Sequence, residues 1–123
     1  MAGVGNVFSD IPDELPDELS EVLVRSGCVR VERIVSRGHR SPVGFWYAQD
    51  EDEFVLLIEG EAELEIEGEA GPRALSRGDW LSLPAGLGHR VSWTTPERDT
   101  IWLAIFAPPS LDRTGGREGA PTR

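Results

Sequence analysis

Between residues 29 and 107 the chain is a series of short apolar segments, each ended by glycine, proline, aspartate or threonine. The segment 61–69 alternates, with Ala62, Leu64 and Ile66 on one side and glutamates on the other. This is the period of a strand with one buried face. The segment 54–60 is apolar on both faces, as expected of a strand between two layers. The pattern predicts an all-β fold, a small antiparallel β-barrel or sandwich.

Further strands are predicted on both sides of these two. The segment 29–36 places Arg30, Glu32 and Ile34 on one face of a half-buried strand. After a turn, 45–49 is predicted to be the next strand. The remaining short segments are 73–79, 80–86, 89–95 and 100–106.

The residues before the barrel are predicted to contain a short helix. Two copies of Pro-Asp-Glu-Leu place proline and carboxylates where the N-terminus of a helix favours them. Leu15, Leu19 and Leu23 then recur at helical spacing, and Gly27 would end the helix. We therefore expect an N-terminal segment with this helix over 1–28, the barrel over 29–107, and a disordered tail over 108–123.

Length and charge limit the class of protein. At 123 residues the chain has room for one core. Its 22 acidic and 12 basic residues give a formal net charge of −10, which disfavours nucleic acid and anionic membrane surfaces as partners.

No apolar run approaches the roughly 20 residues that cross a bilayer, and the N-terminus lacks the pattern of a signal peptide. With Cys28 as the only cysteine, no internal disulfide and no cysteine-rich zinc site can form. We expect a soluble cytoplasmic protein.

Two glycine-punctuated stretches carry the strongest functional signal. The first reads Tyr47-x-Gln49-x-x-x-Glu53, with Gly60 closing the apolar run that follows. In strand numbering 47, 49 and 53 have the same parity, so these side chains can face one side of a sheet if the intervening loop keeps register.

The second stretch has fixed residues at Gly78, Pro84, Gly86 and His89, followed by Trp93. Together the two stretches resemble the paired signature motifs of the cupin superfamily, over roughly residues 29 to 107. In the second, only the last position differs, with Trp93 where the family has asparagine. In the first, the glutamate and glycine match, while the two histidine positions hold Tyr47 and Gln49. The chain looks like a small single-domain bacterial cupin without an assigned reaction.

The resemblance implies a cupin jelly roll, or double-stranded β-helix, with metal ligands inside the barrel. Carried over by position, the ligands would be Tyr47, Gln49, Glu53 and His89. An amide and a phenol in place of two imidazoles should weaken binding of zinc, nickel and copper. The cofactor expected is a divalent metal, either iron(II), manganese or loosely bound zinc. The alternative is a hydrogen-bonded network of the same four side chains without metal.

Other polar and aromatic residues are weaker candidates. His39 is either a rim residue, a replacement ligand or, more simply, a solvated loop histidine. The acidic run 50–52 is interpreted as a hydrated loop. The tryptophans should be in the core or in a dimer interface, apart from Trp93, which could line the mouth of the cavity. The four tryptophans are Trp46, Trp80, Trp93 and Trp102.

Three functions compete on this basis. The first is a metal-dependent enzyme that acts on a small organic molecule, in which the metal polarises a carbonyl or activates dioxygen. The second is a non-catalytic module that binds or senses a small molecule in a metal-free cavity. The third is a structural protein with a vestigial cavity. We favour a metal-binding cupin with a small-molecule ligand, and expect a homodimer from the apolar outer positions Phe54, Leu56 and Ile58 and from family habit.

Overall fold

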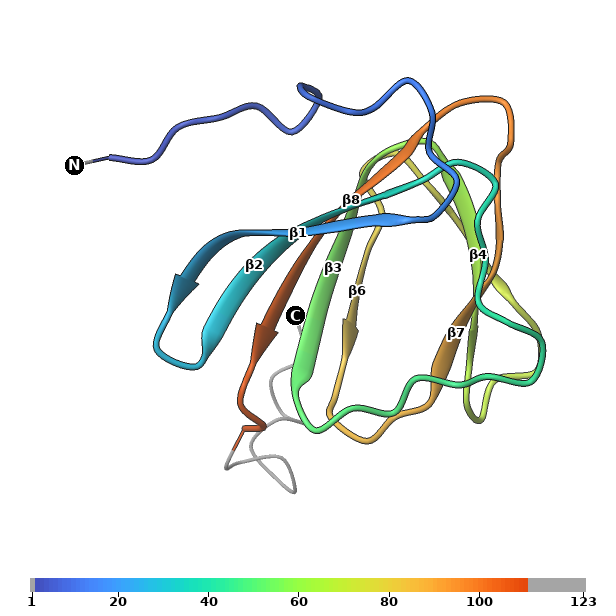
Figure 1. The fold of residues 1–123 in the computed structure, drawn as a ribbon. Coiled ribbons are helices and arrows are strands. Elements are labelled where there is room, and N and C mark those ends of the chain that lie inside the picture. The colour runs from blue at the N-terminus through green and yellow to red at the C-terminus, as the bar shows by residue number, and fades with distance from the viewer. Residues whose placement is uncertain (1, 111–123) are drawn as a thin grey trace.

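A computed structural model describes residues 2–110, and no helix occurs within them. The described residues form eight strands (Figure 1). They are β1 (Leu19–Ser26), β2 (Val29–Ser36), β3 (Asp52–Glu59), β4 (Glu61–Ile66), β5 (Arg73–Ser76), β6 (Trp80–Leu83), β7 (His89–Thr94) and β8 (Thr100–Ala107).

The strands make two antiparallel sheets that face each other. One sheet has the order β1-β2-β8-β3-β6, and the other has the order β5-β4-β7. Figure 1 shows β3, β6 and β8 on one side of the barrel and β4 and β7 on the opposite side. The last strand, β8, lies between β2 and β3, so the sheet joins residues from both ends of the fold. The predicted all-β antiparallel jelly roll is confirmed.

The core lies between the two sheets and takes side chains from both. Val55 and Leu57 on β3 point inward and are buried. Opposite them, β4 buries Ala62, Leu64 and Ile66 and leaves its glutamates at the surface or half-buried. Strict alternation on β4 therefore marks a strand with one buried face.

The predicted N-terminal helix is wrong. Residues 19–26 form β1, which pairs antiparallel with β2, with Ser26 opposite Val29. Gly27 has a φ of 59° and belongs to the tight turn of this hairpin, instead of ending a helix. Leucines at helical spacing gave a weak helical signal, and cross-strand pairing with β2 prevails over it. The sheet thus begins within the segment 1–28.

The predicted strand at 45–49 is reduced to one isolated bridge, between Tyr47 and His89. Gly44 has a φ of 79°, and the Phe45 backbone N–H donates to the Pro42 carbonyl at 3.0 Å. This turn leaves too few extended residues for a regular strand. At the other end, residues 111–123 of the predicted tail lie outside the described residues.

The outer face of the larger sheet carries apolar side chains that no described strand covers. Phe54, Leu56 and Ile58 are only half-buried, although both faces of this segment were predicted to be covered. Trp80 on the adjacent strand is 60% exposed, and its ring lies 5.5 Å from that of Phe54. Of the four tryptophans, only Trp102 is buried.

No helix among the described residues is long and apolar enough to cross a membrane.

The connection between β3 and β4 depends on Gly60. This residue has a φ of 97°, where a side chain is disfavoured. A Cβ atom added there would lie 2.5 Å from the Thr100 Cα and 2.8 Å from the Asp99 carbonyl oxygen, and against the Thr100 hydroxyl. The close approach joins the start of β4 to the start of β8.

We expect Gly60→Ala to lower the free energy of unfolding by more than about 3 kcal/mol, because it adds backbone strain and a steric clash. Gly78→Ala is the matched control. Its φ is 91°, but an added Cβ would meet open space, so it should cost only about 1–2 kcal/mol of strain. Urea denaturation of both variants measures the difference. Equal losses of unfolding free energy in the two variants would contradict a steric clash at position 60.

Candidate functional site

Backbone hydrogen bonds hold the first motif against the second. The Tyr47 N–H donates to the His89 carbonyl at 2.8 Å, and the His89 N–H donates to the Tyr47 carbonyl at 2.9 Å. Two residues further on, the Gly86 N–H donates to the Gln49 carbonyl at 2.8 Å. Gly86 has a φ of 85°, which explains the need for glycine at this motif position. The loop 45–51 is therefore fixed along the start of β7.

Glu53 reaches the same place from β3. Across the sheet it pairs with Leu83 on β6 and Phe106 on β8, and its side chain shares the inward face of Val55. Its Oε1 accepts a hydrogen bond from Gln49 Nε2 at 2.8 Å and lies 3.4 Å from His89 Nε2. The Glu53 and His89 side chains are 11% and 9% exposed. Amide, carboxylate and imidazole thus converge inside the barrel, as the motif spacing predicts.

The fourth predicted ligand, Tyr47, lies beside this group. Its ring stacks on the His89 ring at 5.8 Å and meets the Phe45 ring edge-on at 4.7 Å. Burial raises the pKa of Tyr47, and the negative charges of Glu18 and Glu53 raise it further. The phenol is therefore neutral at ordinary pH and flanks the group without the charge that a strong metal ligand needs.

The neighbours of His89 determine which of its two ring nitrogens carries the hydrogen. Its Nδ1 lies 3.2 Å from the Leu87 carbonyl oxygen, which can only accept, so Nδ1 carries the hydrogen of this bond. Nε2 then faces the Glu53 carboxylate. In a neutral ring this places a bare lone pair against an anion, which is repulsive unless a proton or a metal ion lies between them.

The pKa of His89 reflects this position. Burial alone would lower it, but the hydrogen bond and the charge of Glu53, with the Leu87 carbonyl, raise the pKa of His89 above its ordinary value of 6.5. The site therefore favours a cation at Nε2.

A cavity of about 390 Å³ opens in front of these side chains. Its walls are mostly apolar and come from both sheets, while the exposed residues Asp17, Glu18 and Arg40 make its mouth polar. The apolar lining includes Ile34, Val55, Leu64, Leu83, Trp102 and Phe106. The barrel is thus a cup with an apolar wall and one polar group near its base.

Trp93 does not line this cavity, contrary to the prediction. The pairing of β4 with β7 shifts register between Glu63 and Leu64, so that Trp93 lies opposite Glu63 and Val91 opposite Leu64. The extra residue is Ser92, whose hydroxyl donates to the Glu63 carbonyl at 3.2 Å. This bulge turns Trp93 to the outer face, 37% exposed, while His89 and Val91 stay inside. Period-two parity cannot predict such a shift.

His39 is a rim residue and neither a fully solvated histidine nor a ligand of the group. Its Nδ1 accepts the Arg37 backbone N–H at 2.9 Å, and its Nε2 lies 3.0 Å from the Pro16 carbonyl. Both ring nitrogens are thus engaged: Nδ1 within its own loop, and Nε2 in tying the N-terminal segment to the mouth of the cup. The interpretation of His39 as a replacement ligand is not supported by this geometry.

The acidic loop is also more ordered than the sequence suggests. Glu51 accepts two hydrogen bonds from Arg30, and Asp52 accepts the backbone N–H groups of Ala85 and Ser110. Sequence reasoning placed Arg30 on the same face as Glu32 but gave it no function. The sequence signal that could have identified Arg30 was its place with Glu32 on the same strand face as the apolar Ile34.

Comparison with known proteins agrees with this architecture. A cupin domain model matches residues 35–106, more than half of the chain. The chain belongs to the cupin family. This cupin matches no curated protein sequence.

Solved structures show the same fold. A structure from Ralstonia eutropha JMP134, named as a candidate mannose-6-phosphate isomerase, is 42% identical to this cupin, with a TM-score of 0.85 and coverage of 87% of this chain and 99% of that chain. KdgF from a Halomonas species is 24% identical, with a TM-score of 0.65 and coverage of 88% and 95%. An RmlC-like cupin from Desulfovibrio desulfuricans is 21% identical, with a TM-score of 0.68 and coverage of 89% and 100%. The last two support the fold alone.

The donor set of this cupin differs from a histidine-rich site. Within residues 2–110 there is no group of three or more histidine, cysteine, aspartate and glutamate side chains placed to hold a metal. Among the lining residues of this kind, Glu53 and His89 lie together, 3.4 Å apart, and Gln49 adds an amide. The set is thus one nitrogen, one anionic oxygen and one neutral oxygen.

We expect the metal-free protein to lose stability between about pH 6.5 and the raised pKa of His89. The protonated imidazole pairs with Glu53 in the folded state, so its contribution is full below the unfolded pKa and disappears as pH rises through the folded pKa. Thermal unfolding from pH 5.5 to 9 in the presence of a chelator measures this. His89→Gln should remove the pH dependence, and an unchanged profile in that variant would contradict the pairing.

Proposed function

We propose that the cup binds a divalent metal at Glu53, His89 and Gln49, with Tyr47 beside them, and a small organic ligand in the cavity in front. The observation that carries this is the position of His89 Nε2, which is directed at the Glu53 carboxylate 3.4 Å away while Nδ1 faces the Leu87 carbonyl. An anion and a lone pair that face each other inside an apolar cup need a cation between them.

The distances fit a shared coordination sphere. Two ligands bound at about 2.1 Å on adjacent octahedral positions lie about 3.0 Å apart. Glu53 Oε1 lies 2.8 Å from the Gln49 amide nitrogen and 3.4 Å from His89 Nε2. The amide presents its nitrogen to Glu53 here, and a half-turn about its last bond would present the oxygen instead.

The chemistry of the donors limits which metals the site can bind well. One imidazole, one carboxylate and one amide oxygen suit manganese or iron(II), or a loosely bound zinc, better than copper or nickel. A bound ion of this kind would polarise a carbonyl oxygen of the ligand or lower the pKa of a bound water. The protein's own part is to hold the donors, exclude water with the apolar wall and leave one side open to the ligand.

The cavity limits the ligand. A volume of about 390 Å³ lies near the lower end of the usual range for small-molecule sites. Among its charged lining residues, Asp17, Glu18 and Glu53 are acidic and Arg40 is the only arginine or lysine. A sugar phosphate, which the name of the Ralstonia protein suggests, would bring a dianion to a lining whose three carboxylates already balance Arg40 and a bound divalent ion, so that no excess positive charge would remain for the phosphate. A neutral or singly charged oxygenated molecule suits the cup better.

A second candidate function is a small-molecule binding or sensing module without metal. The observation in its favour is that Gln49 Nε2 already donates to Glu53 at 2.8 Å. A proton on His89 Nε2 would then complete the group without a metal. The two candidates differ in what occupies the space between His89 and Glu53.

Metal analysis separates the two. We expect purified, untagged protein to bind close to one equivalent of Mn²⁺ or Fe²⁺, and Glu53→Ala and His89→Ala each to weaken binding at least about 100-fold, because each removes a direct ligand. Isothermal titration and elemental analysis measure this. His39→Ala is the control, since it removes an imidazole at the rim and should leave the affinity unchanged.

If the wild type binds no more metal than the double variant Glu53→Ala/His89→Ala, the metal site does not exist. Binding of small oxygenated molecules to the metal-free protein would then support the sensing module. Metal binding that depends on His39 would instead identify a different site.

We also propose that the protein is a homodimer through the outer face of the larger sheet, where Phe54, Leu56 and Trp80 are incompletely covered. The expected sedimentation mass is about twice 13.5 kDa at micromolar concentration. Trp80→Glu should give a monomer, whereas Trp93→Glu, a matched change on the other sheet, should not. A monomeric wild type would contradict the proposal. The cytoplasmic location expected from the sequence stays a prediction.

A further inference from the structure

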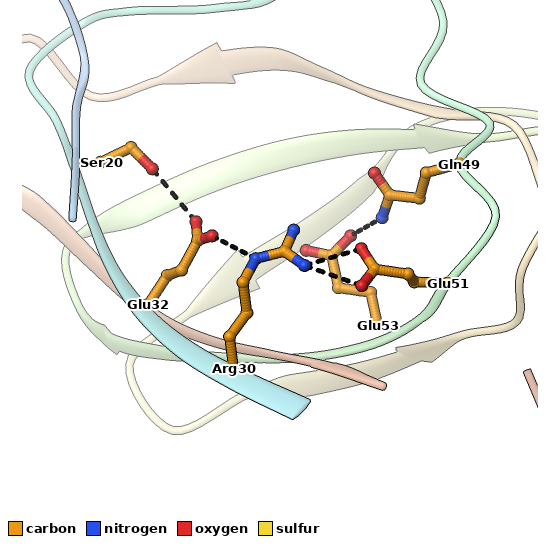
Figure 2. Close-up of polar contacts among 6 residues, drawn as sticks. All are labelled: Ser20, Arg30, Glu32, Gln49, Glu51 and Glu53. Carbon is orange, nitrogen blue, oxygen red and sulfur yellow. Dashed lines mark hydrogen bonds and ion pairs between the residues drawn. The ribbon is translucent and has the colours of Figure 1, made fainter. Parts of the chain in front are cut away.

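Arg30 makes the most extensive side-chain ion contacts near the cup. It lies on the inner face of β2, opposite Phe106 of β8, which is in turn opposite Glu53 of β3. Figure 2 shows its guanidinium between Glu32 and Glu51, with Gln49 and Glu53 next to them. Arg30 Nε donates to Glu32 at 2.7 Å, and Nη1 donates to both oxygens of Glu51 at 2.9 and 2.7 Å.

These contacts fix the guanidinium in one place. Glu32 is itself held by the Ser20 hydroxyl at 3.1 Å, and the Arg30 Cζ lies 4.2 Å above the centre of the Phe106 ring. The side chains of Arg30, Glu32 and Glu51 are 24%, 14% and 31% exposed, so water screens these pairs only in part. A lysine could not contact two carboxylates through separate, rigidly spaced nitrogens.

The partner Glu51 lies at the centre of a short turn. Gln49 and Glu53 stand two residues before and after it, and the hydrogen bond from Gln49 to Glu53 closes the turn at 2.8 Å. The side chains proposed to bind metal are therefore the two ends of a turn whose middle residue is tied to Arg30.

The other side of the turn is held by backbone groups. The Gly86 N–H donates to the Gln49 carbonyl, and the Ala85 N–H donates to Asp52 Oδ1 at 2.9 Å. The loop before β7 thus supports one side, and Arg30 supports the other from across β8. Within the described residues, no other side chain bonds to Glu51.

We propose that Arg30 is a positioning residue, which acts through Glu51 to hold Gln49 and Glu53 in the geometry that receives the metal. This rests on the proposed metal site. Arg30 touches neither proposed ligand within hydrogen-bond distance, so its effect must pass through the turn.

Whether removal of the Arg30 guanidinium weakens or strengthens metal binding distinguishes a positioning role from a purely electrostatic one. A guanidinium repels a divalent cation, so if charge alone mattered, its removal would strengthen metal binding. If the contact between Arg30 and Glu51 positions the ligands, removal of Arg30 weakens metal binding even though the repulsion is relieved. Loss of an outer-shell partner typically costs about 10- to 100-fold in metal affinity.

The test compares the wild type with Arg30→Met, Glu51→Gln and the double variant, by titration with Mn²⁺ and by amide hydrogen exchange of residues 50–53 without metal. Arg30→Met should weaken Mn²⁺ binding about 10- to 100-fold and speed exchange in this turn. The double variant should be no worse than the worse single variant, because both break the same contact. Glu51→Gln keeps the test valid if Arg30→Met does not fold.

Arg73→Met is the matched control. Arg73 makes a similar two-nitrogen contact with Glu69, at 2.9 and 3.2 Å, but neither residue lines the cup. It should change neither Mn²⁺ affinity nor exchange in the turn.

The outcomes separate this inference from the metal site itself. If the wild type binds Mn²⁺ and Arg30→Met binds it equally well or more tightly, the positioning role is overturned. If the wild type binds no Mn²⁺, the proposed function fails, and amide hydrogen exchange then decides whether Arg30 holds the turn. Faster exchange in Arg30→Met supports this role of Arg30, and unchanged exchange overturns it.

Discussion

A carboxylate on the inner wall of an apolar cup must be satisfied by its neighbours, and Glu53 imposes this requirement on the rest of the structure. Its side chain is 11% exposed and shares its face of β3 with Val55 and Leu57. Burial of an unpaired charge would cost several kcal/mol. The Gln49 amide and the His89 imidazole meet the requirement, and the position of each depends on backbone hydrogen bonds between distant parts of the chain.

The apolar cup and its polar base have a common structural origin. Jelly-roll topology places β8 between β2 and β3, so that β2 lies two strands from Glu53. It is this order that lets Arg30 reach Glu51 over the Phe106 ring. The same order joins the β3–β4 turn at Gly60 to Thr100 at the start of β8. Contacts that hold the fold and contacts that hold the site therefore overlap.

Much of the fold could be predicted because period-two patterning has a direct physical cause. Inward and outward side chains alternate on a strand, so Ala62, Leu64 and Ile66 identified their own buried face. Local pattern failed where long-range pairing competed with it. The leucines of 15–23 fit a helix as well as a strand, and only the partner strand β2 decided between them. Trp93 was misplaced because a bulge at Ser92 shifts parity by one residue.

For the site, the sequence alone determined which residue types stand at which motif positions: the turn glycines, the glutamate at 53 and the histidine at 89. Residue spacing is a local property, and these turns need glycine at a positive φ wherever they occur. Only the tertiary structure decided that His89 turns its Nε2 toward Glu53, that Tyr47 stacks beside it, and that Arg30 supports the turn between Gln49 and Glu53. These relations join side chains from β2, β3, β7 and a loop, and their geometry exists only once the two sheets have closed around a common core.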